Sequence, residues 1–237
     1  SVGVKAAAFS AFLRVFLSAF ASLRPDWTMI FWTLSVVTMT LGNLVAISQE
    51  NIKRMLAYSS IAHAGYILVA MTAGGSLATT SIIYYLMAYT LMNLGAFAIV
   101  IIYGKRGEEN ILVTDYAGAG FKYPWLSAAM AVFMFSLAGI PPLAGFIGKF
   151  YIFSAAVKGG FIWLTIIGVL NSLIAAYYYL RVTVVMYMRD PVKEVGALAF
   201  SLPMIAVLII TAFFTLHMGI LPSRYLQLAR ASIEMFM

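Results

Sequence analysis

One lysine of this chain occupies a position at which a functional role is expected. Lys149 lies seven residues beyond a Pro-Pro pair, in a very apolar stretch, LAGIPPLAGFIGKFYIF, residues 137–153. An ammonium group in mid-membrane is costly, so such a lysine is by default functional. Because a lysine amine can be charged or neutral, it suits a proton relay. Alternatively its stem carries the charge to the membrane surface. About eight apolar or small residues separate it from Lys158, which makes that route difficult.

Two further titratable side chains lie in apolar stretches. Lys5 is near the start of the sequence, where the apolar pattern is already running, and we expect that more helix upstream would place it towards mid-membrane. His63 has hydroxyl-bearing neighbours within two turns, namely Tyr58, Ser59, Ser60 and Tyr66. Such a cluster can hold water or hydrogen bonds, and histidine titrates near neutrality. A structural histidine fits these residues equally well, so both interpretations stay open.

The acidic residues lie outside the apolar stretches. All eight fall in expected loops, at helix entries or at the end of the sequence: Asp26, Glu50, Glu108, Glu109, Asp115, Asp190, Glu194 and Glu234. Either the lysines are largely neutral, or a partner carboxylate comes from another chain or from a part of the protein outside this sequence. Single polar residues inside the apolar stretches, such as Asn43, Asn171 and His217, are expected to join helices.

The composition is that of a membrane protein. Of the 237 residues, 63% are hydrophobic and 10% are charged, and the mean hydropathy is +0.97. Soluble domains carry about 25% charged residues. The net charge of +7 fits loops and contact with a lipid bilayer better than nucleic-acid binding. Cysteine is absent, which excludes a disulfide framework, a thiol nucleophile and iron–sulfur ligation by thiolate. With no glycine-rich phosphate loop after a strand, we expect no cofactor, metal site or catalytic residue in this chain.

The hydropathy pattern predicts an all-α protein with seven transmembrane helices, since a spanning helix needs about 20 mainly apolar residues. They cover Val2–Ala21, Thr28–Ile47, Ile52–Ala73, Thr79–Tyr103, Trp125–Val157, Phe161–Tyr187 and Leu198–Ile220. They form a single transmembrane domain over residues 1–237.

The fifth of these stretches is predicted to be discontinuous at about residues 138–145. As one helix its 33 residues would reach roughly 50 Å, against a hydrocarbon core of about 30 Å. Pro141 and Pro142 lack an N–H, and a proline disfavours the helical conformation in the residue before it. Glycines surround the pair, at Gly139, Gly145 and Gly148. We therefore expect two half-helices joined near mid-membrane, as at ion sites in transporters; the alternative is a kink that only shapes packing.

The orientation follows from the basic residues in the loops. One side has Lys53, Arg54, Lys105, Arg106, Lys122, Arg189 and Lys193, and the other has Arg24, Lys158, Arg224 and Arg230. This excess predicts that the first side is cytoplasmic, with the amino terminus inside and the carboxyl terminus outside.

Four stretches occur together in an order that identifies a resemblance. They are SVGVKAAAFSAFLRVF, NIKRMLAYSSIAHAGYILVA, YYLMAYTLMNLGAFA and SLAGIPPLAGFIGKFYIF. The chain resembles the antiporter-like membrane subunits of respiratory complex I (NADH-quinone oxidoreductase). The wording SSIAHAGY and GEENI…DYAGAG is most similar to the subunit N branch, called subunit 2 in mitochondria.

The resemblance implies a fold of fourteen helices built from two inverted five-helix repeats, of which this chain matches helices eight to fourteen. The amino-terminal half, expected to be missing here, would carry a glutamate and another lysine. By the same resemblance Lys5, His63 and Lys149 form the polar axis of the family, and the partners are other complex I membrane subunits in the inner or cytoplasmic membrane.

The function that the resemblance implies is proton translocation through the lysine and histidine relay, coupled to quinone reduction in other subunits, with no redox site in this chain. Alternatives are a subunit of an Mrp-type cation/proton antiporter or of a membrane-bound hydrogenase, which share the broken helix. A purely structural assembly subunit is the alternative of another class.

Overall fold

The computed structural model describes residues 2–104, 111–191, 198 and 200–234. Within these residues the regular structure is helical, apart from one isolated bridge between Asn51 and Leu112. The charged residues Lys105, Arg106, Glu108, Glu109, Lys193 and Glu194, which entered the predictions above, lie outside the described part of the chain.

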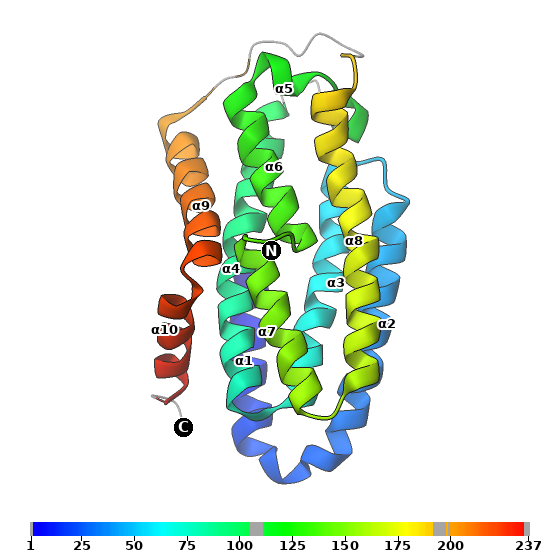
Figure 1. The fold of residues 1–237 in the computed structure, drawn as a ribbon, viewed down its shortest axis with the longest axis vertical. Coiled ribbons are helices and arrows are strands. Elements are labelled where there is room, and N and C mark those ends of the chain that lie inside the picture. Colours follow the sequence, from blue (N-terminus) through cyan, green and yellow to red (C-terminus); the bar gives the residue numbers. More distant parts are fainter. Residues whose placement is uncertain (1, 105–110, 192–197, 199, 235–237) are drawn as a thin grey trace.

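The helices run along the long axis of the molecule and are labelled in Figure 1. They are α1 (Val2–Arg14), α2 (Arg24–Ile47), α3 (Ile52–Ala73), α4 (Gly75–Tyr103), α5 (Ala119–Lys122), α6 (Pro124–Ala138), α7 (Ala144–Lys158), α8 (Ile162–Met188), α9 (Leu202–Ile220) and α10 (Pro222–Glu234). Among the described residues, five helices are long and apolar enough to cross a membrane: α2, α3, α4, α8 and α9. The chain is thus an all-helical membrane protein, as predicted.

The first and last predicted spans differ from the observed helices. α1 ends at Arg14 and is followed by a π-helical turn (Val15–Ala19) and a 3-10 turn (Ala21–Leu23). α2 then begins at Arg24, earlier than predicted, because Pro25 suits the first turn of a helix. At the other end α10 was not predicted at all. It begins at Pro222 and carries polar and charged residues, so a search for apolar spans does not find it.

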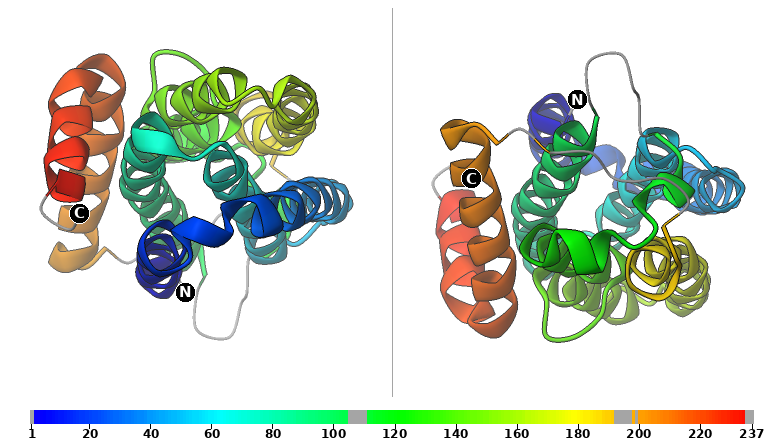
Figure 2. Two further views of the ribbon diagram at one scale, coloured as in Figure 1. Left: turned by 90° about the horizontal axis from the view of Figure 1, so that it is seen from below. Right: turned by 90° about the horizontal axis from the view of Figure 1, so that it is seen from above.

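α3 and α4 are the most buried of the long helices and form the centre of the bundle. The end-on views of Figure 2 show the other helices around them, with α9 and α10 on one side. α2 and α3 pack very closely at two glycines. A Cβ added to Gly42 would lie 2.6 Å from the backbone nitrogen of Ala62, and one added to Gly65 would lie 2.4 Å from Met39 Cγ. His63 lies on α3, and its side chain is buried.

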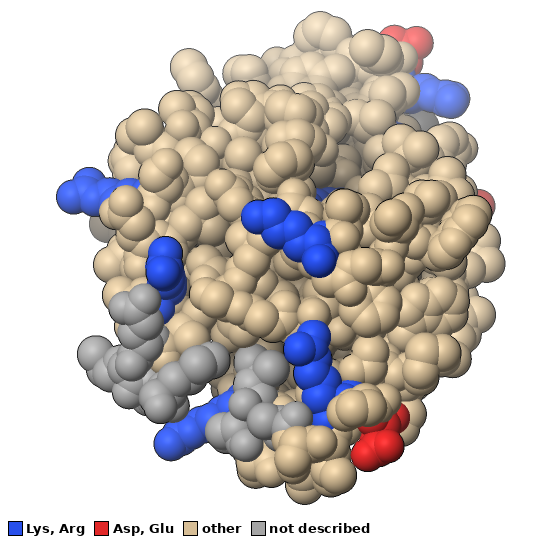
Figure 3. All heavy atoms as spheres, turned by 60° about the horizontal axis from the view of Figure 1, so that its bottom comes forward, with Lys and Arg blue, Asp and Glu red and all other residues tan. Residues whose placement is uncertain are grey.

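Charge is sparse on the surface that the molecule presents in Figure 3, where single basic groups are separated by wide uncharged areas. Large apolar side chains are exposed on α2, α8 and α9, for example Met29, Leu173 and Ile209, each 64% exposed. These faces suit contact with lipid.

The predicted helix interruption lies between α6 and α7, at residues 139–143. Gly139 has φ +91°, and its N–H bonds the Ser136 carbonyl (3.1 Å) while the Ile140 N–H bonds the Phe135 carbonyl (3.0 Å). These two bonds form a Schellman cap, in which glycine is favoured because the capping residue is left-handed. Pro141 and Pro142 follow in non-helical backbone, and the peptide bond between them is cis.

α7 restarts close against the end of α6. The Gly145 N–H bonds the Ser136 hydroxyl (3.0 Å), and a Cβ on Gly145 would lie 1.8 Å from the Ser136 carbonyl oxygen. Glycine is therefore required at this position, and the close approach fixes the two half-helices relative to each other. The break is a defined structure that positions the residues after it, Lys149 among them.

Candidate functional site

Lys149 is buried at the break, with 4% of its surface exposed. Its ammonium donates to the carbonyl oxygens of Leu137 and Ala138, both at 3.0 Å, and to the Ser172 hydroxyl of α8 at 2.9 Å. In a continuous helix those two carbonyls would accept from the N–H groups of residues 141 and 142. Both of these residues are prolines without an N–H, so the Pro-Pro pair leaves two acceptors free for Lys149.

The number of hydrogen-bond acceptors at this site and the sign of its local charge both suit an ammonium. A lysine ammonium has three N–H donors, and the three acceptors just named take all of them. The carboxyl end of a helix carries partial negative charge, so the end of α6 stabilises a cation. The ring of Tyr66 adds a further favourable contact, with Lys149 Nζ 5.0 Å from its centroid.

His63 is fully inside the bundle, 1% exposed, and both of its ring nitrogens have partners. Nδ1 lies 2.5 Å from the hydroxyl of Tyr85 on α4, and Nε2 lies 2.9 Å from the hydroxyl of Tyr179 on α8. A neutral imidazole donates through one nitrogen and accepts at the other, whereas an imidazolium donates through both. The two hydroxyls can serve either form by rotating.

Tyr66 connects His63 to Lys149. Its ring lies edge-on to the His63 ring, with centroids 5.7 Å apart, and its other contacts include Lys149. Tyr66 therefore lies in contact with both titratable side chains.

Lys5 reaches the same region from α1, and its side chain is half-buried. Its ammonium donates to the Ser60 hydroxyl and to the Ser60 carbonyl, the latter at 3.2 Å. Ser60 lies three residues before His63, so both are on the same side of α3. α1 starts near the height at which α6 and α7 meet (Figure 1).

A second set of hydrogen bonds fixes α2 against α8 beside Tyr66. Asn43 donates to the Asn171 carbonyl (3.0 Å) and side-chain oxygen (3.1 Å) and accepts from the Tyr178 hydroxyl (2.9 Å). It also lies 3.5 Å from the Tyr66 hydroxyl. These hydrogen bonds join α2 to α8, which is the role predicted for both asparagines.

The other supporting residues have different surroundings. Ser59 donates to the Leu56 carbonyl one turn back on its own helix (2.8 Å), and Tyr58 is half-buried against the apolar core. Gly148 lets Tyr85 approach α7, since a Cβ there would lie 2.5 Å from the Tyr85 ring.

Three partners were not identified from sequence: Tyr85, Tyr179 and Ser172. Tyrosines do recur in the middle of α4 and α8, at residues 84, 85 and 89 and at residues 177–179. That pattern was a usable signal, but it does not say which tyrosines face inwards. In the described part of the chain, no group of three His, Cys, Asp or Glu side chains could hold a metal.

Comparison with known proteins identifies the family of the chain. A family profile described as NADH:quinone oxidoreductase/Mrp antiporter, TM, matches residues 1–175. NADH-quinone oxidoreductase subunit N of Trichlorobacter lovleyi is 53% identical over 235 residues, which are 99% of this chain and 48% of that protein. NADH-quinone oxidoreductase subunit N 1 of Solibacter usitatus is 47% identical over 233 residues, which are 98% of this chain and 48% of that protein. The chain thus spans about half the length of the curated relatives it matches.

Solved structures show the same fold. A chain of respiratory complex I from Thermus thermophilus with bound aureothin is 32% identical, with a TM-score of 0.72, and the match covers 88% of this chain and 48% of that one. A chain of the Mrp complex from Dietzia has a TM-score of 0.82 over 95% of this chain and 50% of that one. At 20% identity the latter supports the fold alone.

Proposed function

Because this chain belongs to the NADH:quinone oxidoreductase/Mrp antiporter family, we propose that it is part of a proton-translocating, antiporter-like membrane subunit of NADH-quinone oxidoreductase (complex I). The observation that carries the proposal is the ammonium of Lys149, held by the two carbonyls that Pro141 and Pro142 leave free. Quinone reduction takes place in other subunits of the complex, and this chain moves protons.

Lys149 can hold and release a proton without rearrangement of the backbone. As an ammonium it donates to both carbonyls and to Ser172. As a neutral amine it keeps two donors for the carbonyls and gains a lone pair, which accepts from the Ser172 hydroxyl once that hydroxyl rotates. Ser172 is thus the partner that changes from acceptor to donor when Lys149 loses its proton.

The relay that we propose runs through Lys5, His63 and Lys149. Ser60 and Tyr66 lie between successive members, and Tyr85 and Tyr179 hold His63 in either protonation state. Bridging water fills the remaining gaps, as it does in many polar sites. Since like charges disfavour each other, a proton arriving at one group promotes release from the next.

The proposal also covers the orientation of the chain in the membrane, the fold of the whole subunit and its partners. The end that carries Lys53, Arg54, Lys122 and Arg189 is cytoplasmic, because the sequence assigns seven basic residues to that side and four to the other. The fold is one half of an inverted-repeat arrangement with seven membrane-crossing segments, α6 and α7 forming one of them. Other complex I membrane subunits and the remaining length of the subunit supply a carboxylate near Lys149, because the only acidic residue of the described spans, Asp26, lies in the first turn of α2.

Proton movement per electron tests this function in vesicles that contain the assembled enzyme. We expect proton movement to start with quinone reduction and to continue unchanged when sodium is replaced by choline. Proton movement that requires sodium and runs without quinone reduction would contradict the proposal and favour cation/proton exchange, which the family description, NADH:quinone oxidoreductase/Mrp antiporter, also covers.

Ser172→Ala tests the donor–acceptor switch. We expect proton transfer to slow by about ten- to a hundredfold, because one hydrogen bond to a charged group contributes roughly 1.5–3 kcal/mol and each 1.4 kcal/mol or so is a factor of ten. Ser172→Thr keeps the hydroxyl and should retain most of the transfer rate. The measurement is the initial rate of proton movement at matched quinone reduction; equal rates in the Ala and Thr variants would remove Ser172 from the mechanism.

A further inference from the structure

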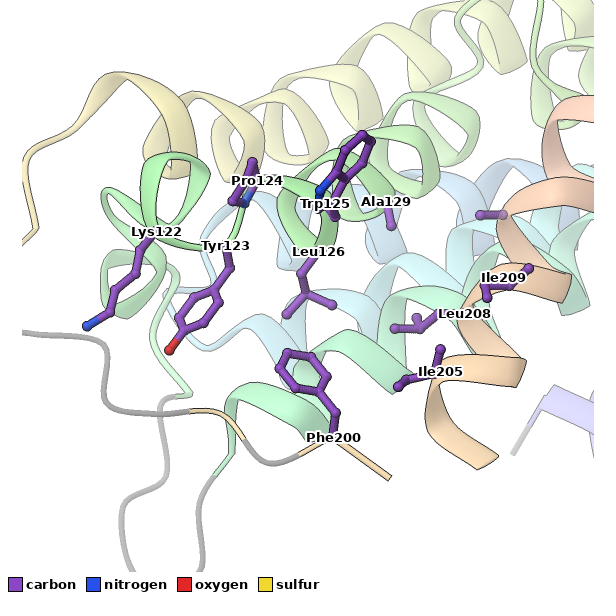
Figure 4. Close-up of a pocket in the computed structure, with 11 residues that line it drawn as sticks. Lys122, Tyr123, Pro124, Trp125, Leu126, Ala129, Phe200, Ile205, Leu208 and Ile209 are labelled. Atoms are coloured by element: carbon purple, nitrogen blue, oxygen red, sulfur yellow. The ribbon is translucent and has the colours of Figure 1, made fainter. Parts of the chain in front are cut away.

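A groove of about 550 Å³ lies between the first half of α6 and the first half of α9, far from the relay (Figure 4). Its walls are apolar and include Leu126 and Ala129 of α6 and Leu208 and Ala212 of α9. The polar side chains that line it come from the segment just before α6, where Lys122 and Tyr123 lie. The groove therefore has one cationic end and an apolar body.

The groove opens where lipid is expected. α9 is apolar, and only 22% of its apolar span is buried, so most of its surface faces outwards. Trp125 lines the groove three residues after Lys122 and is 88% exposed. Tryptophan is enriched at the boundary between hydrocarbon and headgroups. Its position indicates that Lys122 lies at headgroup level and that the apolar walls extend into the acyl region.

We propose that this groove binds an acidic phospholipid, with an acyl chain between α6 and α9 and the phosphate against Lys122. Basic pockets between transmembrane helices on the cytoplasmic side are suited to such headgroups. The same end of the molecule carries Lys53, Arg54 and Arg189 together with Glu50, Asp115 and Asp190, so Lys122 is the positive charge that the groove itself supplies. A soluble ligand would find no polar partner beyond the mouth of the groove. A zwitterionic lipid brings its own cation beside its phosphate, so only an acidic lipid offers Lys122 a net negative charge.

Photo-crosslinking of lipid in the assembled, reconstituted complex tests the site. The probe is phosphatidylglycerol with a diazirine in its acyl chain, compared with the same analogue of phosphatidylcholine, and labelled peptides are mapped by mass spectrometry. We expect phosphatidylglycerol to label residues 126–129 and 208–212 severalfold more than phosphatidylcholine does. Lys122→Glu should remove that preference, and Ala129→Phe should reduce labelling by both probes because it fills the groove.

Lys158→Glu is the matched control, because it reverses one exposed charge at the end of α7, outside the groove. It should leave labelling unchanged, and unaltered quinone reduction shows that each variant complex is assembled. Equal labelling by the two lipids, or an unchanged preference in Lys122→Glu, would overturn the proposal. Either result would mean that the groove is filled by ordinary boundary lipid without selection for the headgroup. Crosslinks from these residues to another subunit, with no lipid adduct, would also overturn it.

Discussion

Lys149→Met is expected to stop proton translocation through this subunit while the subunit still inserts and assembles. Methionine fills nearly the same space but can neither carry a proton nor donate to the carbonyls of Leu137 and Ala138. A positioned proton-transfer group contributes about 10²-fold or more to the rate of its step. The two carbonyls lose a donor, at about 1–3 kcal/mol each, but the cost of burying an ammonium disappears as well. We therefore expect a folded variant without transfer.

The measurement is the number of protons moved per electron in reconstituted vesicles, with quinone reduction recorded in parallel. Lys158→Met is the matched control, because it removes an exposed lysine from the end of the same helix. Its ratio should be that of the unaltered enzyme. If Lys149→Met also pumps normally, Lys149 is not part of the relay.

His63→Phe is the second substitution with a large expected effect. The ring shape is retained, but both nitrogens are lost, so the hydroxyls of Tyr85 and Tyr179 lose their shared partner. Two buried hydroxyls left without it cost about 1–3 kcal/mol each, which lowers stability. The relay is also interrupted between Lys5 and Lys149, and we expect proton movement to fall by about 10²-fold, as for other proton-transfer groups.

His217→Phe is the matched control. It removes a histidine from a membrane span without removing a member of the proposed relay. His217 lies on α9, is half-buried, and bonds Tyr225 of α10 at 2.7 Å through Nδ1. It is not part of the relay and should affect stability without changing protons per electron. If His63→Phe behaves in the same way, then His63 is a structural residue, the alternative that its sequence context left open.

The helix break was predictable because its causes are local. A proline has no N–H wherever the chain runs, and a glycine two residues before Pro141 can take the left-handed conformation that closes a Schellman cap. The resulting interruption at residues 139–143 lies within the predicted range. α10 was missed because it is a short helix with a polar face, and a hydropathy pattern does not distinguish such a segment from a loop.

The partners of the titratable residues were not predictable in the same way. That Lys149 and His63 are buried follows from their apolar neighbours along the chain. That Tyr85 and Tyr179 are the hydroxyls beside His63 depends on how α4 and α8 are rotated about their axes, and a single sequence does not specify those rotations. Ser59 illustrates the same limit, because its hydroxyl donates to the Leu56 carbonyl of its own helix and also interacts with Tyr179 of α8, a partner that a single sequence does not specify.

The central claim is that Lys149 works by releasing its proton, and Lys149→Arg tests it most directly. Arginine keeps a positive charge and several donors for the carbonyls of Leu137 and Ala138, but it stays protonated at all relevant pH values. We predict that the Lys149→Arg enzyme assembles and reduces quinone, yet moves as few protons per electron as Lys149→Met. A normal ratio in the arginine variant would mean that only charge and hydrogen bonding are needed at this position, and would contradict the account.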